Sequence, residues 1–254
     1  MIRKFVRSFV NKFGYDLVKP DSRLVVNGLP VDFDKATLDT YYKVKPYTMT
    51  TPERIASLCN AVNYLVENKI EGDFVECGVW RGGSTMAAID TLIKNADTSR
   101  EIYLYDTFEG MSEPTELDKI TTGTGANELM ETSDKNDATS VWCYSALEEV
   151  QQNVGTLKYP AAQVHYVKGK VEDSIPGTMP GKIALLRLDT DWYESTAHEL
   201  KHLYPLLVPG GVIIIDDYGH WEGARKAVDE YMEAEKLPLL LNRIDYTGRI
   251  GIKY

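Results

Sequence analysis

Fully apolar segments alternate with amphipathic ones along most of the chain. Runs such as IALL (183–186) and VIII (212–215) carry no polar side chain, as expected of strands in a sheet that is covered on both faces. Seven strands are predicted, at 72–80, 101–108, 163–169, 181–189, 210–216, 237–244 and 248–254. Apolar residues at helical spacing predict helices at 52–69, 84–94, 145–154, 195–206 and 224–234. This alternation predicts an α/β fold with right-handed helical crossovers between parallel strands.

The end of the chain departs from this alternation. The last two predicted strands are joined only by DYTG (245–248), which is too short for a crossover, so they must pair as an antiparallel hairpin. A seven-stranded, mostly parallel sheet with such a C-terminal hairpin is typical of Rossmann-like class I methyltransferases. The hairpin distinguishes this fold from that of dehydrogenases.

Two further segments frame the predicted domain. Residues 1–50 are expected to form an N-terminal helical or lid extension and residues 51–254 the main domain. The polar stretch 109–139 is expected to be a mobile, lid-like insert rather than part of the core. Within MIRKFVRSFVNKFG (1–14), apolar and basic residues at helical spacing predict a short amphipathic helix. It can dock on its own domain, on a partner subunit in a homodimer, or on anionic lipid. We favour the first two over membrane contact.

Composition narrows the classes of partner. Asp and Glu number 38 against 28 Lys and Arg, a net charge of −10, which repels a nucleic-acid backbone. The three cysteines, Cys59, Cys77 and Cys143, form no CxxC pair, so buried thiols in a reduced cytoplasm are expected rather than disulfides or a zinc site. No apolar run approaches the ~20 residues of a membrane span.

A glycine-rich turn follows the first predicted strand of the main domain, in ECGVWRGGST (76–85). Gly78 and Gly82 allow backbone N–H groups at a helix start to approach a ligand. The spacing is GxxxGG rather than the GxGxxG of dinucleotide sites. Just before the turn, Glu76 can either take the ammonium of a methionine moiety or bond to loop amides, and both interpretations stay open.

Asp106 ends the next strand. An acid at this position can accept both ribose hydroxyls of a nucleoside, and we favour this role over the alternative of a turn cap suggested by Thr107 and Gly110. Ribose binding is common to NAD and S-adenosylmethionine sites. The residue therefore indicates a nucleoside without identifying it.

Acidic clusters follow two later strands, in LRLDTDWYES (186–195) and GGVIIIDDYG (210–219). If the two strands are neighbours, Asp189, Asp216 and Asp217 converge at the carboxyl edge of the sheet, where they would repel one another unless a cation lay among them. Their oxygens suit Mg²⁺. Asp191, two residues beyond Asp189, is the best placed general base. Helix capping is the structural alternative for each residue alone.

The histidines are expected to have lesser roles. His198 and His202 are four apart on a predicted helix, but no full zinc ligand set accompanies them, so we interpret them as surface or packing residues. His220 follows the Asp216–Asp217 pair and is expected to line an acceptor pocket.

These motifs together resemble the macrocin O-methyltransferase family, which includes enzymes that methylate deoxysugars of macrolide and aminocoumarin antibiotics. The resemblance extends from YTMT (47–50) to the helix near Ala224, through VECGVWRGGST, YDTFEGM, LRLDTDWYEST and GGVIIIDDYG. It implies S-adenosylmethionine as methyl donor, a homodimer, and a sugar hydroxyl of a glycosylated metabolite or glycan precursor as acceptor.

The same resemblance implies roles for individual residues. Asp189, Asp216 and Asp217 would be the metal ligands and Asp191 the base. Thr48 and Met49 would approach the cofactor, Ser84 would lie near the glycine turn, and Asp106 would bind the ribose.

Three other functions compete with this one. A catechol-type methyltransferase also uses Mg²⁺ and aspartates, but it requires vicinal phenolic hydroxyls. A nucleotide-dependent oxidoreductase gives no role to four clustered aspartates. A non-catalytic protein that binds an adenosyl ligand or a glycan would not depend on Asp191.

Overall fold

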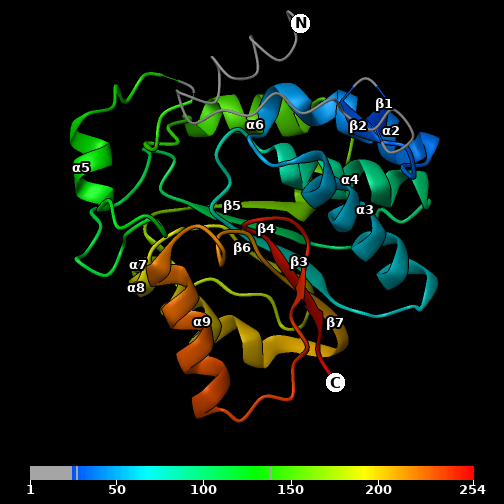
Figure 1. Ribbon diagram of the computed structural model, residues 1–254. Coiled ribbons are helices and arrows are strands. Elements are labelled where there is room, and N and C mark those ends of the chain that lie inside the picture. The colour runs from blue at the N-terminus through cyan, green and yellow to red at the C-terminus, as the bar shows by residue number, and fades with distance from the viewer. Residues whose placement is uncertain (1–24, 27, 138) are drawn as a thin grey trace, which may run out of the picture. The chain divides into compact units, whose positions relative to one another are not determined.

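The computed structural model describes residues 25–26, 28–137 and 139–254 (Figure 1). The amphipathic helix expected at 1–14 lies outside these residues. The chain divides after Lys35 into two units, and each is described by itself. In the first, β1 (Val25–Val26) pairs antiparallel with β2 (Leu29–Pro30).

A seven-stranded sheet forms the centre of the second unit. Its strands are β3 (Asp73–Cys77), β4 (Ile102–Asp106), β5 (Val164–Lys168), β6 (Ile183–Leu188), β7 (Leu207–Ile215), β8 (Asn242–Arg243) and β9 (Arg249–Ile252). Their order is β5-β4-β3-β6-β7-β9-β8. The first five strands in that order are parallel, whereas β9 is antiparallel to both β7 and β8. The predicted Rossmann-like fold with a C-terminal antiparallel hairpin is therefore confirmed.

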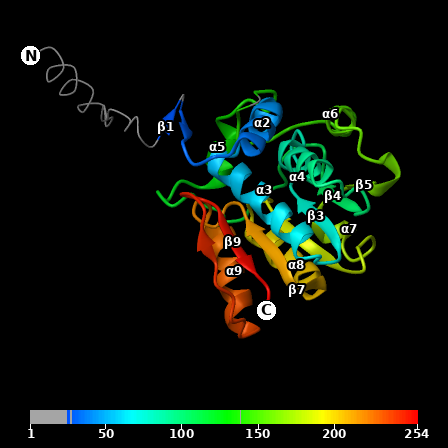
Figure 2. The same ribbon diagram turned by 90° about the vertical axis from the view of Figure 1, so that its right-hand side faces the viewer.

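Helices cover both faces of this sheet. They are α2 (Lys35–Val44), α3 (Pro52–Glu67), α4 (Gly83–Lys94), α5 (Ala126–Glu131), α6 (Leu147–Gly155), α7 (Val171–Ser174), α8 (Tyr193–Leu203) and α9 (Glu222–Ala234), with 3-10 turns η1 (Lys45–Tyr47), η2 (Ala161–Gln163) and η3 (Tyr204–Leu206). Figures 1 and 2 show α3, α4 and α6 on one side of the strands and α7, α8 and α9 on the other. Among the described residues, no helix is both long enough and apolar enough to cross a membrane.

Strand β6 lies at the middle of the sheet and is buried along its whole length. Its aliphatic side chains pack with those of β3 and β7 in one cluster that also includes Leu200 and Leu203 of α8. One charged residue, Arg187, interrupts the apolar sequence of β6 and is 4% exposed. Because burying an unpaired charge is very costly, this arginine must have partners inside the protein.

The first strand of the C-terminal hairpin is shorter than predicted. Strand pairing begins at Asn242, and only Asn242 and Arg243 face β9. Pro238 has no N–H to donate to a ladder, and β9 itself has only four residues. The leucines at 237, 239 and 241 pack against the core instead of extending the strand.

The segment expected to be a mobile insert is partly core. Between β4 and α6 it contains α5, whose Ala126 and Met130 are buried against Trp192 and Trp221. Asp118 of this segment is fully buried. It accepts a hydrogen bond at 2.8 Å from the backbone N–H of Tyr193, the first residue of α8. We call residues 109–137 the excursion. The prediction that none of it belongs to the core is wrong for Ala126 and Met130.

Candidate active site

A cavity of about 480 Å³ opens at the carboxyl ends of the parallel strands, within the ~300–1,000 Å³ range of small-molecule sites. It is lined by every predicted site residue except Gly82: Thr48, Met49, Glu76, Gly78, Ser84, Asp106, Asp189, Asp191, Asp216 and Asp217. Segments far apart in sequence thus contribute to one site, as the strand-end positions of these residues predicted.

The register of the central strands brings the acidic residues together. Cys77 of β3 pairs with Leu188 of β6, which in turn pairs with Ile215 of β7. The next residues continue the pattern, because Asp189 N–H donates to Cys77 C=O and Asp216 N–H to Leu188 C=O, each at 2.9 Å. The two acidic segments therefore leave the sheet side by side.

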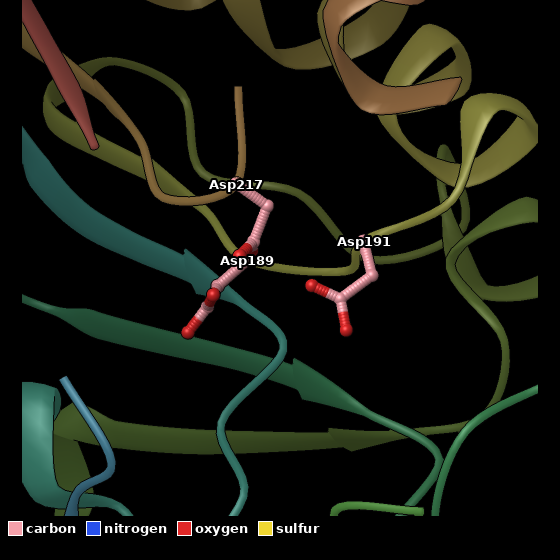
Figure 3. A group of neighbouring side chains, drawn as sticks. All are labelled: Asp189, Asp191 and Asp217. Carbon is pink, nitrogen blue, oxygen red and sulfur yellow. The ribbon is translucent and has the colours of Figure 1, made fainter. Parts of the chain in front are cut away.

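Three aspartates form a carboxyl cluster beyond these strand ends. Oxygens of Asp189, Asp191 and Asp217 lie within 4.8 Å of one another, and all three residues are half-buried (Figure 3). Burial, together with the charges of neighbouring aspartates, raises the pKa values of Asp189 and Asp217 well above the usual range. One oxygen of Asp217 is buried and has no hydrogen-bond partner among the described residues. The cluster has the oxygen chemistry and the unmet charge that a hard divalent cation satisfies.

Asp191 differs from the other two in its backbone and its titration. Its φ is +66°, a left-handed conformation that is uncommon for a residue with a side chain. Burial, followed by the charges of Asp189 and Asp216, raises its pKa to about 7, although a hydrogen bond with Asp217 and the charge of Arg54 oppose the rise. A carboxyl group with such a pKa can accept a proton and release it near neutral pH.

Asp216 does not join this cluster. Its carboxylate is 2% exposed and accepts from Arg187 at 2.6 Å on one oxygen and from Arg54 on the other. Arg54 also pairs with Asp245 at 3.1 Å. The structure thus brings Asp189, Asp191 and Asp217 together and places Asp216 behind them, between two arginines.

Arg187 connects the glycine-turn end of the cavity with the acidic end. One nitrogen of its guanidinium donates to Glu76 at 2.5 Å and lies 2.7 Å from Asp189, and the other nitrogen contacts Asp216. The second oxygen of Glu76 accepts from the Thr85 hydroxyl. Both oxygens of Glu76 therefore have partners inside the protein, neither of which is a loop amide.

The glycine turn lies against the acidic segment. Gly78 has a φ of +80°, and a Cβ there would overlap the carbonyl oxygen of Asp189. Glycine is thus required both for the conformation and for the close approach. Gly82 forms the N-cap of α4 at a φ of +88°, behind the cavity wall. A Cβ at Gly83 would overlap the Tyr47 carbonyl, so the segment with Thr48 and Met49 crosses the start of α4.

Asp106 braces this turn. One of its oxygens accepts from the backbone N–H groups of Val79 at 2.6 Å and Trp80 at 3.1 Å, and the other from Phe108 N–H at 2.7 Å. The last contact is the turn-capping bond considered as an alternative. Asp106 also lines the cavity. Its hydrogen bonds to Val79 and Trp80 orient the backbone of the glycine turn beside the cavity.

Several lining residues were not predicted. Trp80, in the glycine turn, has a buried indole N–H without a hydrogen-bond partner among the described residues. Arg187 was detectable as the single charge in an apolar strand, whereas nothing local marked Arg54 or Tyr246. The expected placement of His220 at the cavity holds, and its Nδ1 contacts the Tyr246 hydroxyl.

The remaining histidines and cysteines lie mostly as expected. His198 contacts the carbonyl of Ile175 at 3.0 Å, and the ring of His202 packs against that of His198 in a tilted arrangement. Cys59 and Cys77 are buried, but Cys143 is only half-buried and lines the cavity. Burial raises the pKa values of Cys77 and Cys143, which keeps both thiols protonated and poorly reactive.

Comparison with known proteins places this site in a family. The model of the macrocin O-methyltransferase family (TylF) matches residues 9–250. A tetracenomycin-C rhamnosyl 4'-O-methyltransferase from Streptomyces olivaceus is 33% identical over 232 residues, covering 90% of this chain and 84% of the relative. Demethyldecarbamoylnovobiocin O-methyltransferase from Streptomyces niveus is 31% identical, and the match covers 80% of this chain and 74% of that relative.

A solved structure agrees with these sequence matches. The O-methyltransferase NovP superimposes with a TM-score of 0.70 and 30% identity, covering 82% of each chain. The family match spans both the glycine turn and the acidic cluster, the two ends of the cavity described above. The chain therefore belongs to the macrocin O-methyltransferase family and is an S-adenosylmethionine-dependent O-methyltransferase.

Proposed function

We propose that this protein transfers a methyl group from S-adenosylmethionine to a sugar hydroxyl of a glycosylated small molecule, with Mg²⁺ positioning the acceptor and Asp191 as general base. The observation that carries this proposal is the shared cavity. It joins a glycine turn at one end to three clustered carboxyl groups at the other. One of those groups, Asp191, titrates near neutral pH.

We propose Asp189 and Asp217 as Mg²⁺ ligands, because their oxygens lie close together and their charges repel. Asp216 is the third proposed ligand. To bind it, the cation would compete with Arg54 and Arg187 for the Asp216 carboxylate. A bound divalent ion would orient the acceptor oxygens and lower the pKa of the attacking hydroxyl.

Asp191 would then accept the proton that the acceptor hydroxyl loses in the reaction. As the acceptor oxygen forms its bond to the methyl carbon, the carbon–sulfur bond of the donor breaks and the hydroxyl proton passes to Asp191. Burial raises the pKa of Asp191 to about 7 without metal, and Mg²⁺ bound nearby would lower it, so the carboxylate would be ionised and able to accept the proton at neutral pH.

The cofactor end has several proposed binding groups. We assign the ribose to Asp106, and the neighbourhood of the methionine moiety to Thr48, Met49, Ser84 and the glycine turn at Gly78 and Gly82. Glu76 is proposed to support the cofactor site through Arg187 and Thr85, which occupy both of its oxygens, because its side chain is buried whereas that of Asp106 is half-buried. The indole N–H of Trp80 is an additional donor for the cofactor.

The acceptor would lie at the other end of the cavity. Met111, Leu129, Trp221 and Tyr246 line it together with His220, and aromatic faces with a few polar groups suit the apolar and hydroxyl faces of a sugar ring. The relatives named above act on glycosylated natural products, which supports the same acceptor class here. A homodimer in the cytoplasm completes the proposal, and sedimentation velocity of the full chain tests the dimer.

Turnover with a panel of glycosides and catechols tests the proposed reaction. We expect methylation of a glycoside, loss of activity with EDTA, and recovery with Mg²⁺. Full activity in EDTA would contradict the metal site, and methylation restricted to catechols would favour the alternative enzyme.

The same assay tests the base. Asp191→Asn should lower kcat by about 100-fold or more while S-adenosylmethionine affinity is retained. Asp134→Asn, at an exposed aspartate of the excursion, is the control and should behave as the unaltered protein does. An Asp191→Asn variant with normal kcat would refute the assignment.

A further inference from the structure

Glu199 is an acid buried in an unexpected place. It lies on α8, is 0% exposed, and belongs to none of the groups assigned above. One of its oxygens accepts from the Thr190 hydroxyl at 2.9 Å, and the carboxyl group also contacts the buried thiol of Cys77 on β3. Burial raises the pKa of Glu199 well above its usual range. A carboxyl group is costly to bury unless it is hydrogen-bonded, so its contact with Thr190 is important for the fold around it.

Thr190 is the centre of the turn that presents the base. It lies between Asp189, at the end of β6, and Asp191, whose φ is +66°. The Thr190 carbonyl accepts from Trp192 N–H at 2.7 Å and from the Ser195 hydroxyl at 3.4 Å. The contact from Ser195, at the start of α8, is long, and the hydroxyl contact of Thr190 to Glu199 is a second, shorter link between the turn and α8.

A left-handed conformation is unfavourable for a residue with a side chain and persists only where the surroundings enforce it. Here the turn is enforced from two directions. On the sheet side, the Asp189 carbonyl abuts Gly78. On the helix side, Glu199 holds Thr190. Loss of the second anchor would let the turn relax while β6 and α8 stay in place.

We infer that Glu199 is a positioning residue for methyl transfer: its hydrogen bond to Thr190 holds the turn in which Asp191 faces the acceptor. The inference rests on the proposed role of Asp191 as the base. Glu199 is not itself a lining residue of the cavity and is not a member of the carboxyl cluster, but it contacts Thr190, which lines the cavity. It acts through Thr190.

Four variants separate this role from simple packing. Thr190→Val removes the donor with little change in volume, and Thr190→Ser retains the hydroxyl. Glu199→Gln keeps an acceptor oxygen for Thr190, whereas Glu199→Leu removes it. Thr91→Val is the matched control, because it deletes another buried threonine hydroxyl, one that donates within α4 to Ala87 at 2.8 Å.

We expect Thr190→Val and Glu199→Leu each to lower kcat by about tenfold, since small displacements of a reacting group reduce rates steeply. Acceptor KM and the affinities for S-adenosylmethionine and Mg²⁺, measured by calorimetry, should change less than about twofold. Thr190→Ser, Glu199→Gln and Thr91→Val should keep kcat within about twofold. The double variant Thr190→Val/Glu199→Leu should be no slower than either single one, as both remove the same contact.

Normal kcat in Thr190→Val would overturn the inference, and this variant keeps the test decisive even if Glu199→Leu fails to fold. A parallel loss of kcat and of cofactor affinity would also overturn it, because it would indicate general damage. Asp191→Asn is assayed alongside. If that variant is fully active, the proposed base itself is wrong, whereas an inactive Asp191→Asn with a normal Thr190→Val refutes only the role of Glu199.

Discussion

Asp217 has one buried oxygen without a hydrogen-bond partner among the described residues, and two other carboxyl groups lie beside it. Burial and the charges of Asp191 and Asp216 raise its pKa well above the unfolded value. An acid whose pKa is higher in the folded state than in the unfolded state lowers the free energy of unfolding wherever the unfolded chain is ionised. This destabilisation begins as pH rises above the unfolded pKa of ~3.9 and is greatest above the folded pKa.

We therefore expect Asp217→Asn to unfold at the same temperature as the unaltered protein or at a higher one, in EDTA at pH 8. Added Mg²⁺ should raise the unfolding temperature of the unaltered protein and have little effect on the variant. Thermal unfolding followed by circular dichroism measures both. A variant that is destabilised in EDTA would show that Asp217 stabilises the metal-free fold, contrary to its unmet charge.

The strand-end aspartates and the glycine turn could be predicted from sequence because strand ends in a parallel sheet share one edge. The partners of each side chain could not. Asp216 and Asp217 are adjacent in sequence and both line the cavity, yet one contacts two arginines and the other joins the carboxyl cluster. Asp216 is held apart partly by Arg54, which comes from α3 far away in the chain and has no local signal.

Among the helices, α2 is tied to α4 by one buried aspartate. Asp90 accepts from Thr40 at 2.7 Å and from Lys43, and it pairs with Lys94 at 2.8 Å. Burial alone would raise its pKa, but the hydrogen bonds from Lys43, Lys94 and Thr40 outweigh burial and lower it. A lowered folded pKa means that Asp90 stabilises the protein above the unfolded pKa of ~3.9 and that this stabilisation is lost as pH falls through the folded pKa.

Asp90→Asn should accordingly reduce the free energy of unfolding by about 1–2 kcal/mol at pH 7, and the difference from the unaltered protein should shrink below pH 4. Urea unfolding across this pH range tests the prediction. Asp134→Asn, which changes an exposed aspartate, is the control. A difference that does not depend on pH would mean that the charge of Asp90 has no part in holding α2.

The excursion is tied to α8 in a similar way. Asp118 accepts from Thr115 N–H at 2.7 Å and from Tyr193 N–H at 2.8 Å, and a Cβ at Gly223 would overlap its side chain. Asp118→Ala should lower the free energy of unfolding by about 1–2 kcal/mol, because the backbone N–H of Tyr193 at the start of α8 would lose its acceptor. It should also make the excursion more sensitive to protease in limited digestion. Asp134→Ala, in the same segment but exposed, should change neither, and equal sensitivity of the two variants would contradict the anchoring role.

Helix α5 and this buried aspartate escaped prediction because the excursion has little apolar periodicity. Its order comes from Trp192 and Trp221, which belong to other parts of the chain. By contrast, strands such as β6 and β7 could be located from their apolar runs alone, and the hairpin of β8 and β9 from its short connection. Long-range aromatic packing leaves no comparable local pattern.

For the whole molecule, binding of the methyl donor should stabilise the fold. At about 100 times its Kd, a ligand that binds only the folded state adds about 2.7 kcal/mol, which for a domain of this size corresponds to roughly 5–10 °C in Tm. S-adenosylmethionine should produce such a shift in differential scanning fluorimetry, and NAD⁺ should produce none. A shift with NAD⁺ alone would contradict the assignment to this enzyme class.

The contact between Gly78 and the Asp189 carbonyl has a consequence for how such enzymes diversify. The glycine turn and the turn at Asp189 touch through main-chain atoms, so mutation of either one disturbs both, and selection must preserve them as a pair. Side chains of the excursion and the last hairpin, such as Met111, Leu129 and Tyr246, also line the cavity, at the end where we propose that the acceptor lies, and they can be exchanged singly. Descendants of one ancestor can therefore acquire new acceptors by drift at these positions while inheriting the reaction unchanged.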